Sequence, residues 1–327
     1  MTKSFSQTKL ALGGDITLTI VCDVTNDTVN NLFNNLWQAI FQFERRFSRF
    51  VPMSELSIFN RSAGIKSQIS NEFRDILQSS NTMSQKTNGL FNPFVLPALQ
   101  RAGYTKSFVE DYQNDNHDDY SAKQVVPYDN LEIGDNWATI PYGTAIDLGG
   151  CGKGYLADLL ADTKVPDWVQ GFWFSIGGDI VGSGVDENNE SWKVSISSAT
   201  DPNLDSPWYI TAPKKRFAVA TSGTIIRGGT KDGKNWHHII NPHTGKPATS
   251  DTILATVYTE KAIEADVLAS CAIILGSKKS ISFLKDNRVL ATLLQTKNDL
   301  GEDRQISFGR SIHLNKSLPN KLVVNYA

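Results

Sequence analysis

Strand patterns outnumber helix patterns along this chain, and the two do not alternate regularly. Residues 15–24 alternate apolar and polar side chains and are rich in β-branched residues, which predicts a strand. A doubly wound parallel sheet needs strands and helices in turn, so this order favours the α+β class instead, with mixed or antiparallel sheets and flanking helices. The further expected strands are 171–176 and 179–184 on either side of a Gly-Gly turn, 192–198, 208–212, 216–223, 251–259, 289–297 and 321–327.

Several helices carry recognisable start signals. Apolar residues repeat every 3.6 residues over 29–41, after a possible cap at Thr25 or Asn26. Ser54 and Ser70 are each placed to cap a further helix.

The domain organisation is predicted to be simple. Another helix is expected over 152–163. Residues 104–122 are polar, acidic and aperiodic, which predicts a surface loop or insertion. No internal repeat is found, so we expect one domain over 1–327.

Charge and cysteine content exclude some partners and suggest a compartment. The 327 residues carry a net charge of −2 and have no basic run, so no nucleic-acid partner is expected. No stretch of 18 apolar residues occurs, and no signal peptide is recognised, so no membrane partner is expected either. Cys22, Cys151 and Cys271 are few, odd in number and far apart, which is typical of free thiols in a reducing compartment. A cytoplasmic location is therefore expected.

The glycine-rich stretch "AIDLGGCGKGY" (145–155) is suited to an anion. Its glycines allow a ligand to approach the backbone, it opens a helix, and Lys153 adds a positive charge. A phosphate or pyrophosphate would fit. The spacing matches neither of the named nucleotide-binding loops, and a plain turn with a solvated lysine is an equally good interpretation.

Histidines gather in "HHIINPHTGKP" (237–247), which holds three of the five in the chain. His238 and His243 are separated by Pro242 and have no nearby Cys pair, so zinc binding is disfavoured. An imidazole here could serve as a general base, although a lone histidine is more often structural.

The stretch "IEADVLASCAIILG" (263–276) is an apolar helix that carries two polar residues on one face. Asp266 and Ser270 are four apart, so they project together. Carboxylate and hydroxyl oxygens are ligands that Mg²⁺ accepts. A solvated face, or an aspartate bonded near the helix start, would explain the same pattern.

Taken in order, the segments resemble one known family. They are "LALGGDITLTI", "RFSRFVPMSELSIFN", "TNGLFNPFVLPAL", "IDLGGCGKGYLAD", "SIGGDI", "ATSG", "HHIINPHTG" and "IEADVLAS". Each is weak alone, but the ordered set is similar to the ApbE family of flavin transferases.

The resemblance implies a ligand in a cleft between two lobes, and it implies site residues. Mg²⁺ would be held by the Gly150 carbonyl, Asp266 and Ser270, with Ser270 where Thr is more usual. His238 would be the catalytic base, and Asp266 would also count as catalytic. The residues expected to bind FAD are Leu12, Phe50, Leu90, Phe91, Asn92, Asp147, Lys153 and Ile240.

The resemblance also implies an activity. FMN would be transferred from FAD, the substrate, to a Thr or Ser hydroxyl of a target protein, with Mg²⁺ as cofactor and AMP released. The alternatives are an FAD hydrolase with the same site and a non-catalytic flavin-binding protein. Ser175, Asn241 and His243 depart from the family's common residues, which affects the fine geometry of the histidine loop. The absence of a recognisable leader suggests an intracellular acceptor.

Overall fold

The computed structural model describes residues 2–107, 120–199, 205–231, 233–297, 301–314 and 323–325. Contacts divide the chain into two compact units. Unit 1 comprises Met1–Ile40, Lys153–Gly223 and Ser250–Ala327, and unit 2 comprises Phe41–Gly152 and Thr224–Thr249. One domain over the whole chain stays a prediction.

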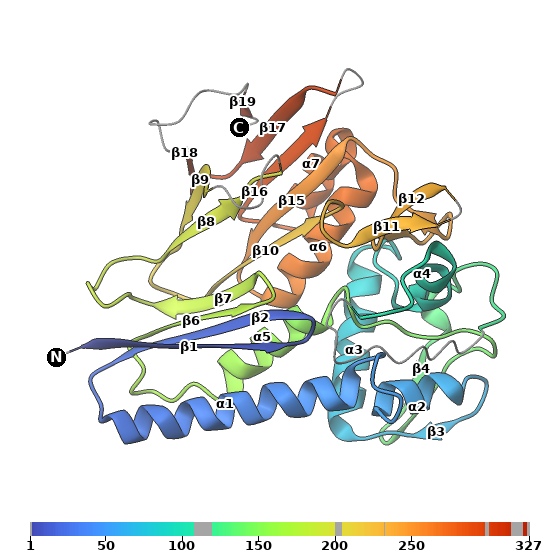
Figure 1. The fold of residues 1–327 in the computed structure, drawn as a ribbon, viewed down its shortest axis with the longest axis horizontal. Helices are drawn as coiled ribbons and strands as arrows, with labels where there is room; N and C mark the ends of the chain where they lie inside the picture. Colours follow the sequence, from blue (N-terminus) through green and yellow to red (C-terminus); the bar gives the residue numbers. More distant parts are fainter. Residues whose placement is uncertain are drawn as a thin grey trace. The chain divides into compact units, whose positions relative to one another are not determined.

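Unit 1 is built on a nine-stranded sheet in the order β1-β2-β6-β7-β10-β15-β16-β17-β19 (Figure 1). Neighbouring strands are antiparallel, except that β17 and β19 are parallel. This arrangement confirms the α+β class. The bounds are β1 Lys3–Ala11, β2 Gly14–Cys22, β6 Gly171–Ile176, β7 Asp179–Gly184, β10 Phe217–Gly223, β15 Thr252–Thr259, β16 Ala291–Lys297, β17 Asp303–Phe308 and β19 Val323–Asn325.

Helix α6 (Ala262–Leu275) packs on β10 and β15 and is buried on most of its surface. Its first turn is capped by Asp158, whose carboxylate accepts the N–H groups of Ala262 and Ile263 at 2.9 and 3.0 Å. A helix start without such an acceptor would leave amide donors unpaired. The other helices of this part are α5 (Gly152–Thr163), α7 (Ser277–Asp286) and α1 (Asn26–Phe47), of which α1 runs on into unit 2.

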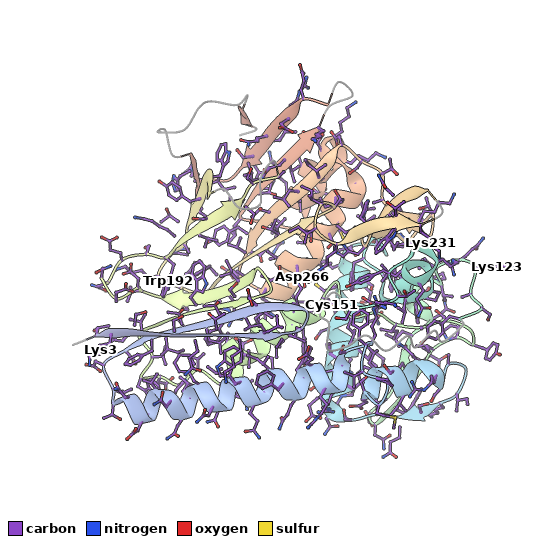
Figure 2. All side chains as sticks on the ribbon, viewed as in Figure 1. Lys3, Lys123, Cys151, Trp192, Lys231 and Asp266 are labelled. Carbon is purple, nitrogen blue, oxygen red and sulfur yellow. The ribbon has the colours of Figure 1, made fainter. Side chains whose placement is uncertain are left out.

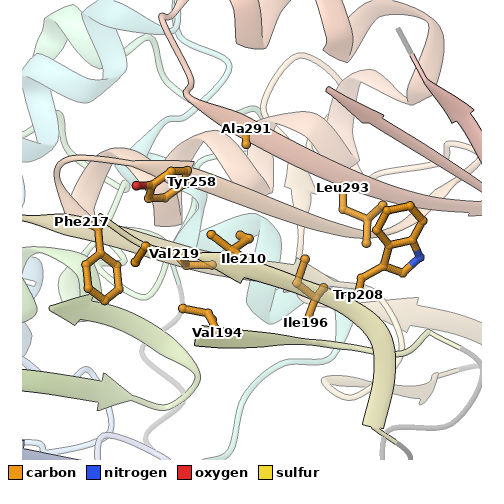
Figure 3. Close-up of a cluster of buried hydrophobic side chains, with 10 residues drawn as sticks. Val194, Ile196, Trp208, Ile210, Phe217, Val219, Tyr258, Ala291 and Leu293 are labelled. Atoms are coloured by element: carbon orange, nitrogen blue, oxygen red, sulfur yellow. The ribbon is translucent and has the colours of Figure 1, made fainter. Parts of the chain in front are cut away.

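A smaller sheet, in the order β18-β9-β8, adds a second apolar cluster to unit 1. Trp208 and Ile210 of β9 (Asp205–Thr211) pack with Val219 and Leu293 of the large sheet (Figure 3). The remaining strands of this sheet are β8 (Lys193–Ser197) and β18 (Ile312–Leu314).

Unit 2 consists of short helices and two- or three-stranded sheets. Both predicted caps are confirmed, since the Ser54 and Ser70 hydroxyls accept the N–H groups of Ser57 and Phe73 at 3.0 and 3.1 Å. Its elements are α2 (Glu55–Arg61), β3 (Ser67–Gln68), α3 (Asn71–Lys86), η1 (Pro93–Val95), α4 (Leu96–Ala102), η3 (Tyr128–Asn130), β4 (Glu132–Ile133), β5 (Trp137–Thr139), β11 (Gly228–Lys231), β12 (Lys234–His237), β13 (Ile240–Asn241) and β14 (Lys246–Pro247).

Two sequence predictions concern thiols and loops. The three cysteines are free and buried, as expected; Cys151 is marked in Figure 2. The predicted loop over 104–122 falls mostly on residues 108–119, which lie outside the described residues. Over the part of the chain that the structure describes, we find no helix with the length and apolar character needed to span a membrane.

Gly154 allows α5 and α6 to approach closely. A Cβ placed there would lie 2.6 Å from the Ala262 carbonyl oxygen and 2.7 Å from the Ile263 Cα. We therefore expect Gly154→Ala to lower the free energy of unfolding by about 1–3 kcal/mol, because backbone atoms must separate. Urea denaturation would measure this. Gly14→Ala is the control, since its nearest neighbour is Gly177 Cα at 3.7 Å. Equal stability of the two variants would contradict the close approach.

Candidate functional site

A lysine between two buried carboxylates forms the polar centre of unit 1. Lys153 Nζ is ion-paired with Asp179 Oδ2 and lies 3.9 Å from Asp266 Oδ2. Asp179 and Asp266 are only 2% and 4% exposed. The Gly154 N–H donates to Asp266 Oδ2 at 3.3 Å, so the first turn of α5 contacts the aspartate of α6 (Figure 2 marks Asp266). Burial on this scale requires compensation, which the lysine and the helix amide supply.

The local folding of each segment explains how these groups meet. Lys153 lies in the first turn of α5, while Asp179 begins β7 directly after Gly177 and Gly178. Both glycines have positive φ values, 58° and 95°, which suit the tight turn between β6 and β7. A side-chain hydrogen bond from an aspartate at this position could hold such a turn. In the structure its carboxylate instead pairs with Lys153.

Leu12 lies in the turn of the β1–β2 hairpin. Leu12 and Gly13 both have positive φ values, 54° and 79°, as the two central residues of a type I′ hairpin turn require. The neighbouring β6–β7 turn is close, because the Gly177 N–H donates to the Asp15 carbonyl at 3.0 Å. A Cβ at Gly177 would lie 3.4 Å from Lys153 Cδ. Leu12 and Lys153 therefore belong to one neighbourhood.

Asp266 and Ser270 project from the same face of α6, one helical turn apart, as predicted. The Ser270 hydroxyl is 2.9 Å from the Ser222 hydroxyl at the end of β10. This contact gives the "ATSG" segment (220–223) at the end of β10 a partner that the sequence did not reveal. Both contacts of Asp266 use Oδ2, so Oδ1 has no hydrogen-bond or ion-pair partner among the described residues.

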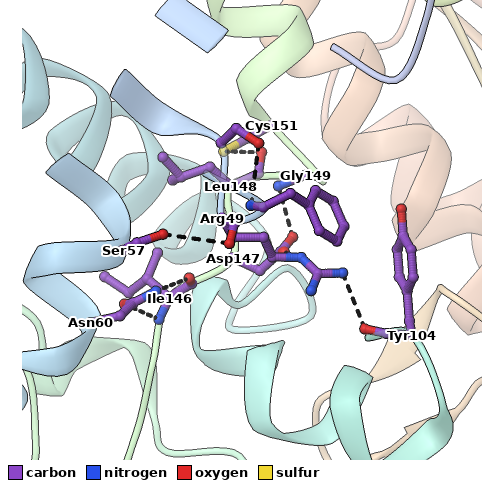
Figure 4. Close-up of polar contacts among 11 residues, drawn as sticks. Arg49, Ser57, Asn60, Tyr104, Ile146, Asp147, Leu148, Gly149 and Cys151 are labelled. Carbon is purple, nitrogen blue, oxygen red and sulfur yellow. Dashed lines mark hydrogen bonds and ion pairs between the residues drawn. The ribbon is translucent and has the colours of Figure 1, made fainter. Parts of the chain in front are cut away.

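In unit 2, Asp147 is held by three contacts (Figure 4). Its Oδ2 forms an ion pair with Arg49 Nε at 2.7 Å, and its Oδ1 accepts the Gly149 N–H at 2.7 Å. Its own N–H donates to the Pro93 carbonyl at 2.8 Å. The carboxylate thus fixes the start of the glycine-rich loop.

The guanidinium of Arg49 contacts two neighbouring rings. It is 4.1 Å from the ring centroid of Phe50 and 4.5 Å from that of Tyr104. Tyr104 stacks on Trp236 with a centroid distance of 6.0 Å and contacts His238 edge-on at 6.4 Å. Burial raises the pKa of the Tyr104 hydroxyl, so this side chain stays neutral. Sequence reasoning singled out Phe50 and His238 but missed Arg49, Tyr104 and Trp236.

The stretch 90–92 has a structural role that the sequence did not reveal. Asn92 caps η1: its Oδ1 accepts the Phe94 N–H and its Nδ2 donates to the Val126 carbonyl, both at 2.9 Å. Phe91 faces Gly150, where a Cβ would lie 3.3 Å from its ring. Leu90 is buried. A role of these residues in FAD binding stays a prediction.

The two adjacent histidines have different surroundings. His237 Nδ1 accepts the Ile239 N–H at 3.3 Å, and Nε2 contacts the Ala248 carbonyl at 2.8 Å, so Nε2 carries the proton. His238 Nδ1 contacts the Arg227 carbonyl at 3.1 Å. A carbonyl only accepts, so the neutral ring of His238 is protonated on Nδ1 and has its lone pair on Nε2. This is the tautomer that a general base needs.

Ile240 follows the two adjacent histidines in the chain and begins β13. It is buried, pairs with Pro247 between β13 and β14, and packs with Ala98 and Leu99 of α4. It anchors the segment that carries His238 to the rest of unit 2.

His237 should make stability depend on pH. Burial lowers its pKa below the ordinary value of 6.5, since desolvation outweighs the hydrogen bond to Ala248. The unfolded chain therefore binds this proton more readily, and the contribution to stability is complete above about pH 6.5 and is lost as the pH falls toward the folded pKa. We expect the free energy of unfolding to fall less between about pH 7.5 and 5.5 in His237→Asn than in the wild type. Parallel slopes in urea denaturation would contradict this assignment.

The predicted site residues divide between the units. Leu12, Lys153, Asp266 and Ser270 lie in unit 1, and the other predicted residues lie in unit 2. Lys153 follows Gly150 by three positions, so the glycine-rich loop is shared by both units.

Comparison with solved structures gives the fold. The structure resembles the apo form of the Pseudomonas stutzeri flavinyl transferase ApbE, with a TM-score of 0.79, 19% identity, and 95% of this chain and 96% of that chain covered. A Thermotoga maritima ApbE protein gives a TM-score of 0.74 at 22% identity, covering 92% and 96% of the two chains. The fold is therefore that of these solved ApbE structures.

Sequence comparison then gives the family. The model of the ApbE family matches residues 12–294, so the chain belongs to the ApbE family. A Vibrio cholerae FAD:protein FMN transferase is 24% identical over 251 residues, 75% of this chain and 74% of the relative. One from Buchnera aphidicola is 32% identical over 158 residues, 48% and 45% of the two chains. The resemblance recognised from the motifs is confirmed, and the chain is an enzyme of the transferase class.

Proposed function

We propose that the chain transfers FMN from FAD to a Thr or Ser hydroxyl of a target protein and releases AMP, with Mg²⁺ as cofactor. The observation that carries the proposal is the buried Asp266 with an open Oδ1, beside Lys153 at the start of α5. A cation, a helix N-terminus and a carboxylate suited to a metal are the groups that bind a metal–pyrophosphate. The names of the relatives, FAD:protein FMN transferase, support the choice of substrate.

The residues present fit Mg²⁺. Asp266 offers Oδ1, and Ser270 offers a hydroxyl from the next turn of the same helix face. Both are the hard oxygen donors that Mg²⁺ prefers, and the ion takes few protein ligands when phosphate oxygens complete its shell. The Gly150 carbonyl is the third proposed ligand. When bound, Mg²⁺ would neutralise charge on the pyrophosphate and stabilise AMP as the leaving group.

The chain's own groups perform the rest of the proposed reaction. Lys153 binds the pyrophosphate, and His238 Nε2 takes the proton of the acceptor hydroxyl. The oxygen of that hydroxyl attacks the FMN phosphorus, so one P–O bond forms to the acceptor. The P–O bond to AMP breaks, and AMP leaves with the bonding electrons. Leu12, Phe50, Leu90, Phe91, Asn92, Asp147 and Ile240 are proposed to hold FAD.

One assay separates this proposal from its alternatives. The purified protein is incubated with FAD and Mg²⁺, with and without a panel of candidate acceptor domains. AMP release that depends on an acceptor, with flavin fluorescence on the denatured acceptor, is the expected result. AMP release without any acceptor would show an FAD hydrolase. Tight flavin binding without turnover would show a flavin-binding protein.

A further inference from the structure

Unit 2 contains an open groove of about 560 Å³ that none of the predicted site residues lines. It lies between the end of α1, α2 and the segment that leads into α3. Apolar, basic and acidic side chains share its walls. Those that matter here are Arg45, Arg46, Met53, Glu55, Ile58 and Phe59.

Two of the lining side chains, Arg46 and Glu55, belong to an ionic network. Arg46 binds Glu55 Oε2 at 2.7 Å and the Ser70 hydroxyl at 2.6 Å, and it lies 3.6 Å from Glu72. Glu55 also accepts the Ser70 N–H at 2.8 Å. These contacts connect the end of α1 with the starts of α2 and α3. The charge of Arg46 is thereby already balanced. The groove is preformed, so little conformational entropy is lost when it is filled.

One cationic side chain without an ion pair among the described residues and two exposed apolar side chains also line the groove. Arg45 is exposed and has no ion-pair partner among the described residues. Met53 and Ile58 are 77% and 45% exposed, and both line the groove. Clustered exposed apolar side chains of this kind mark interaction surfaces. The complementary occupant has an apolar side chain for the groove and a carboxylate for Arg45.

The groove is connected to the flavin-binding segment proposed above. Val51, which lines it, directly follows Phe50 in the chain. The Ser54 N–H donates to the Val51 carbonyl at 3.0 Å, and the Ser57 hydroxyl donates to the Arg49 carbonyl at 3.4 Å. These two contacts hold the start of α2 against the segment that carries Arg49 and Phe50. A partner bound here is therefore bound beside the proposed flavin contacts.

We propose that this groove docks the acceptor protein through an acidic segment that inserts an apolar side chain. The inference rests on the proposed function, because a protein acceptor is needed only if the reaction is protein flavinylation. The acceptor hydroxyl alone offers too little surface for specific binding, since stable protein contacts bury roughly 800 Å² per partner. The groove supplies additional contact area, and Arg45 favours a partner with a negatively charged side chain.

Binding is tested first without turnover. The probes are two fluorescein-labelled peptides, one with a leucine between two aspartates and one with the aspartates changed to lysines. Fluorescence anisotropy with the full chain should show binding of the acidic peptide only. We expect Arg45→Glu and Ile58→Asp each to weaken it at least tenfold. Leu290→Asp is the matched control, because Leu290 is 44% exposed, like Ile58, but lies in unit 1.

Transfer is tested second, with a threonine peptide that does or does not carry the acidic anchor. The anchor should lower KM for flavinylation in the wild type and in Leu290→Asp, and it should have no effect in Ile58→Asp, with FAD binding unchanged in all three. Absence of anisotropy change, or an anchor that binds without lowering KM, would overturn the inference. Displacement of the acidic peptide by dodecanoate below the peptide's own Kd would also overturn it, because the groove would then prefer a free acyl carboxylate. Peptide binding with no flavinylation of any peptide or protein acceptor would instead overturn the proposed function.

Discussion

Asp266→Ala is expected to abolish Mg²⁺-dependent turnover. The variant removes the only carboxylate among the three proposed metal ligands while Lys153 keeps its ion pair with Asp179. Loss of several kcal/mol of charge stabilisation corresponds to a decrease of roughly 10³-fold or more in kcat/KM. Mg²⁺ affinity, measured calorimetrically with FAD present, should fall in parallel, which gives a readout that is independent of turnover.

The control for this variant is Asp158→Asn. Asp158 is a second buried aspartate, located on α5, but its carboxylate caps the start of α6 and pairs with Arg216 at 2.6 Å. Its loss should lower the free energy of unfolding by about 1–3 kcal/mol and leave Mg²⁺ affinity intact. If Asp266→Ala retained Mg²⁺-dependent activity at the wild-type level, the metal assignment would be wrong.

His238→Gln is expected to slow transfer by about 10²–10⁴-fold, the range that a positioned general base contributes. The glutamine side chain can still donate to the Arg227 carbonyl but has no basic nitrogen for the acceptor proton. FAD binding should therefore be nearly unchanged, and the fall of kcat/KM at acidic pH should disappear from the pH–rate profile. Single-turnover measurements with saturating acceptor would isolate this step.

His237→Asn is the adjacent control. His237 uses both ring nitrogens in backbone hydrogen bonds, so its loss should affect stability more than rate. Equal losses of rate in the two variants would contradict the assignment of His238 as the base. A wild-type pH profile in His238→Gln would contradict it as well.

Local features of the fold were predictable because local sequence controls them. The Ser54 and Ser70 caps, the strand at 15–24 and the turn at Gly177 follow from side-chain chemistry next to the element itself. The strand Lys3–Ala11 was not predicted, because most of its residues are exposed and give no clear apolar alternation. Its pairing with β2 is set by the turn at Leu12 and Gly13 instead.

The candidate site was only partly predictable, because its contacts join distant segments. Asp266 and Ser270 were found since they are one helical turn apart. Tyr104 and Trp236 are 132 positions apart, as their numbers show, and no periodicity relates them, yet they stack. Asn92 shows another case: the family resemblance implies a ligand contact, which stays a prediction, and the sequence did not reveal that both polar ends of its side chain hold the backbone.

The burial of all three thiols has a practical consequence. Cys22, Cys151 and Cys271 are 0%, 0% and 1% exposed, so maleimide reagents should not reach them in the folded state. A single cysteine introduced at an exposed position such as Met53 would then be the sole labelling site of the native chain. A fluorophore or spin label could then be attached at one chosen position at a time, without first preparing a cysteine-free background.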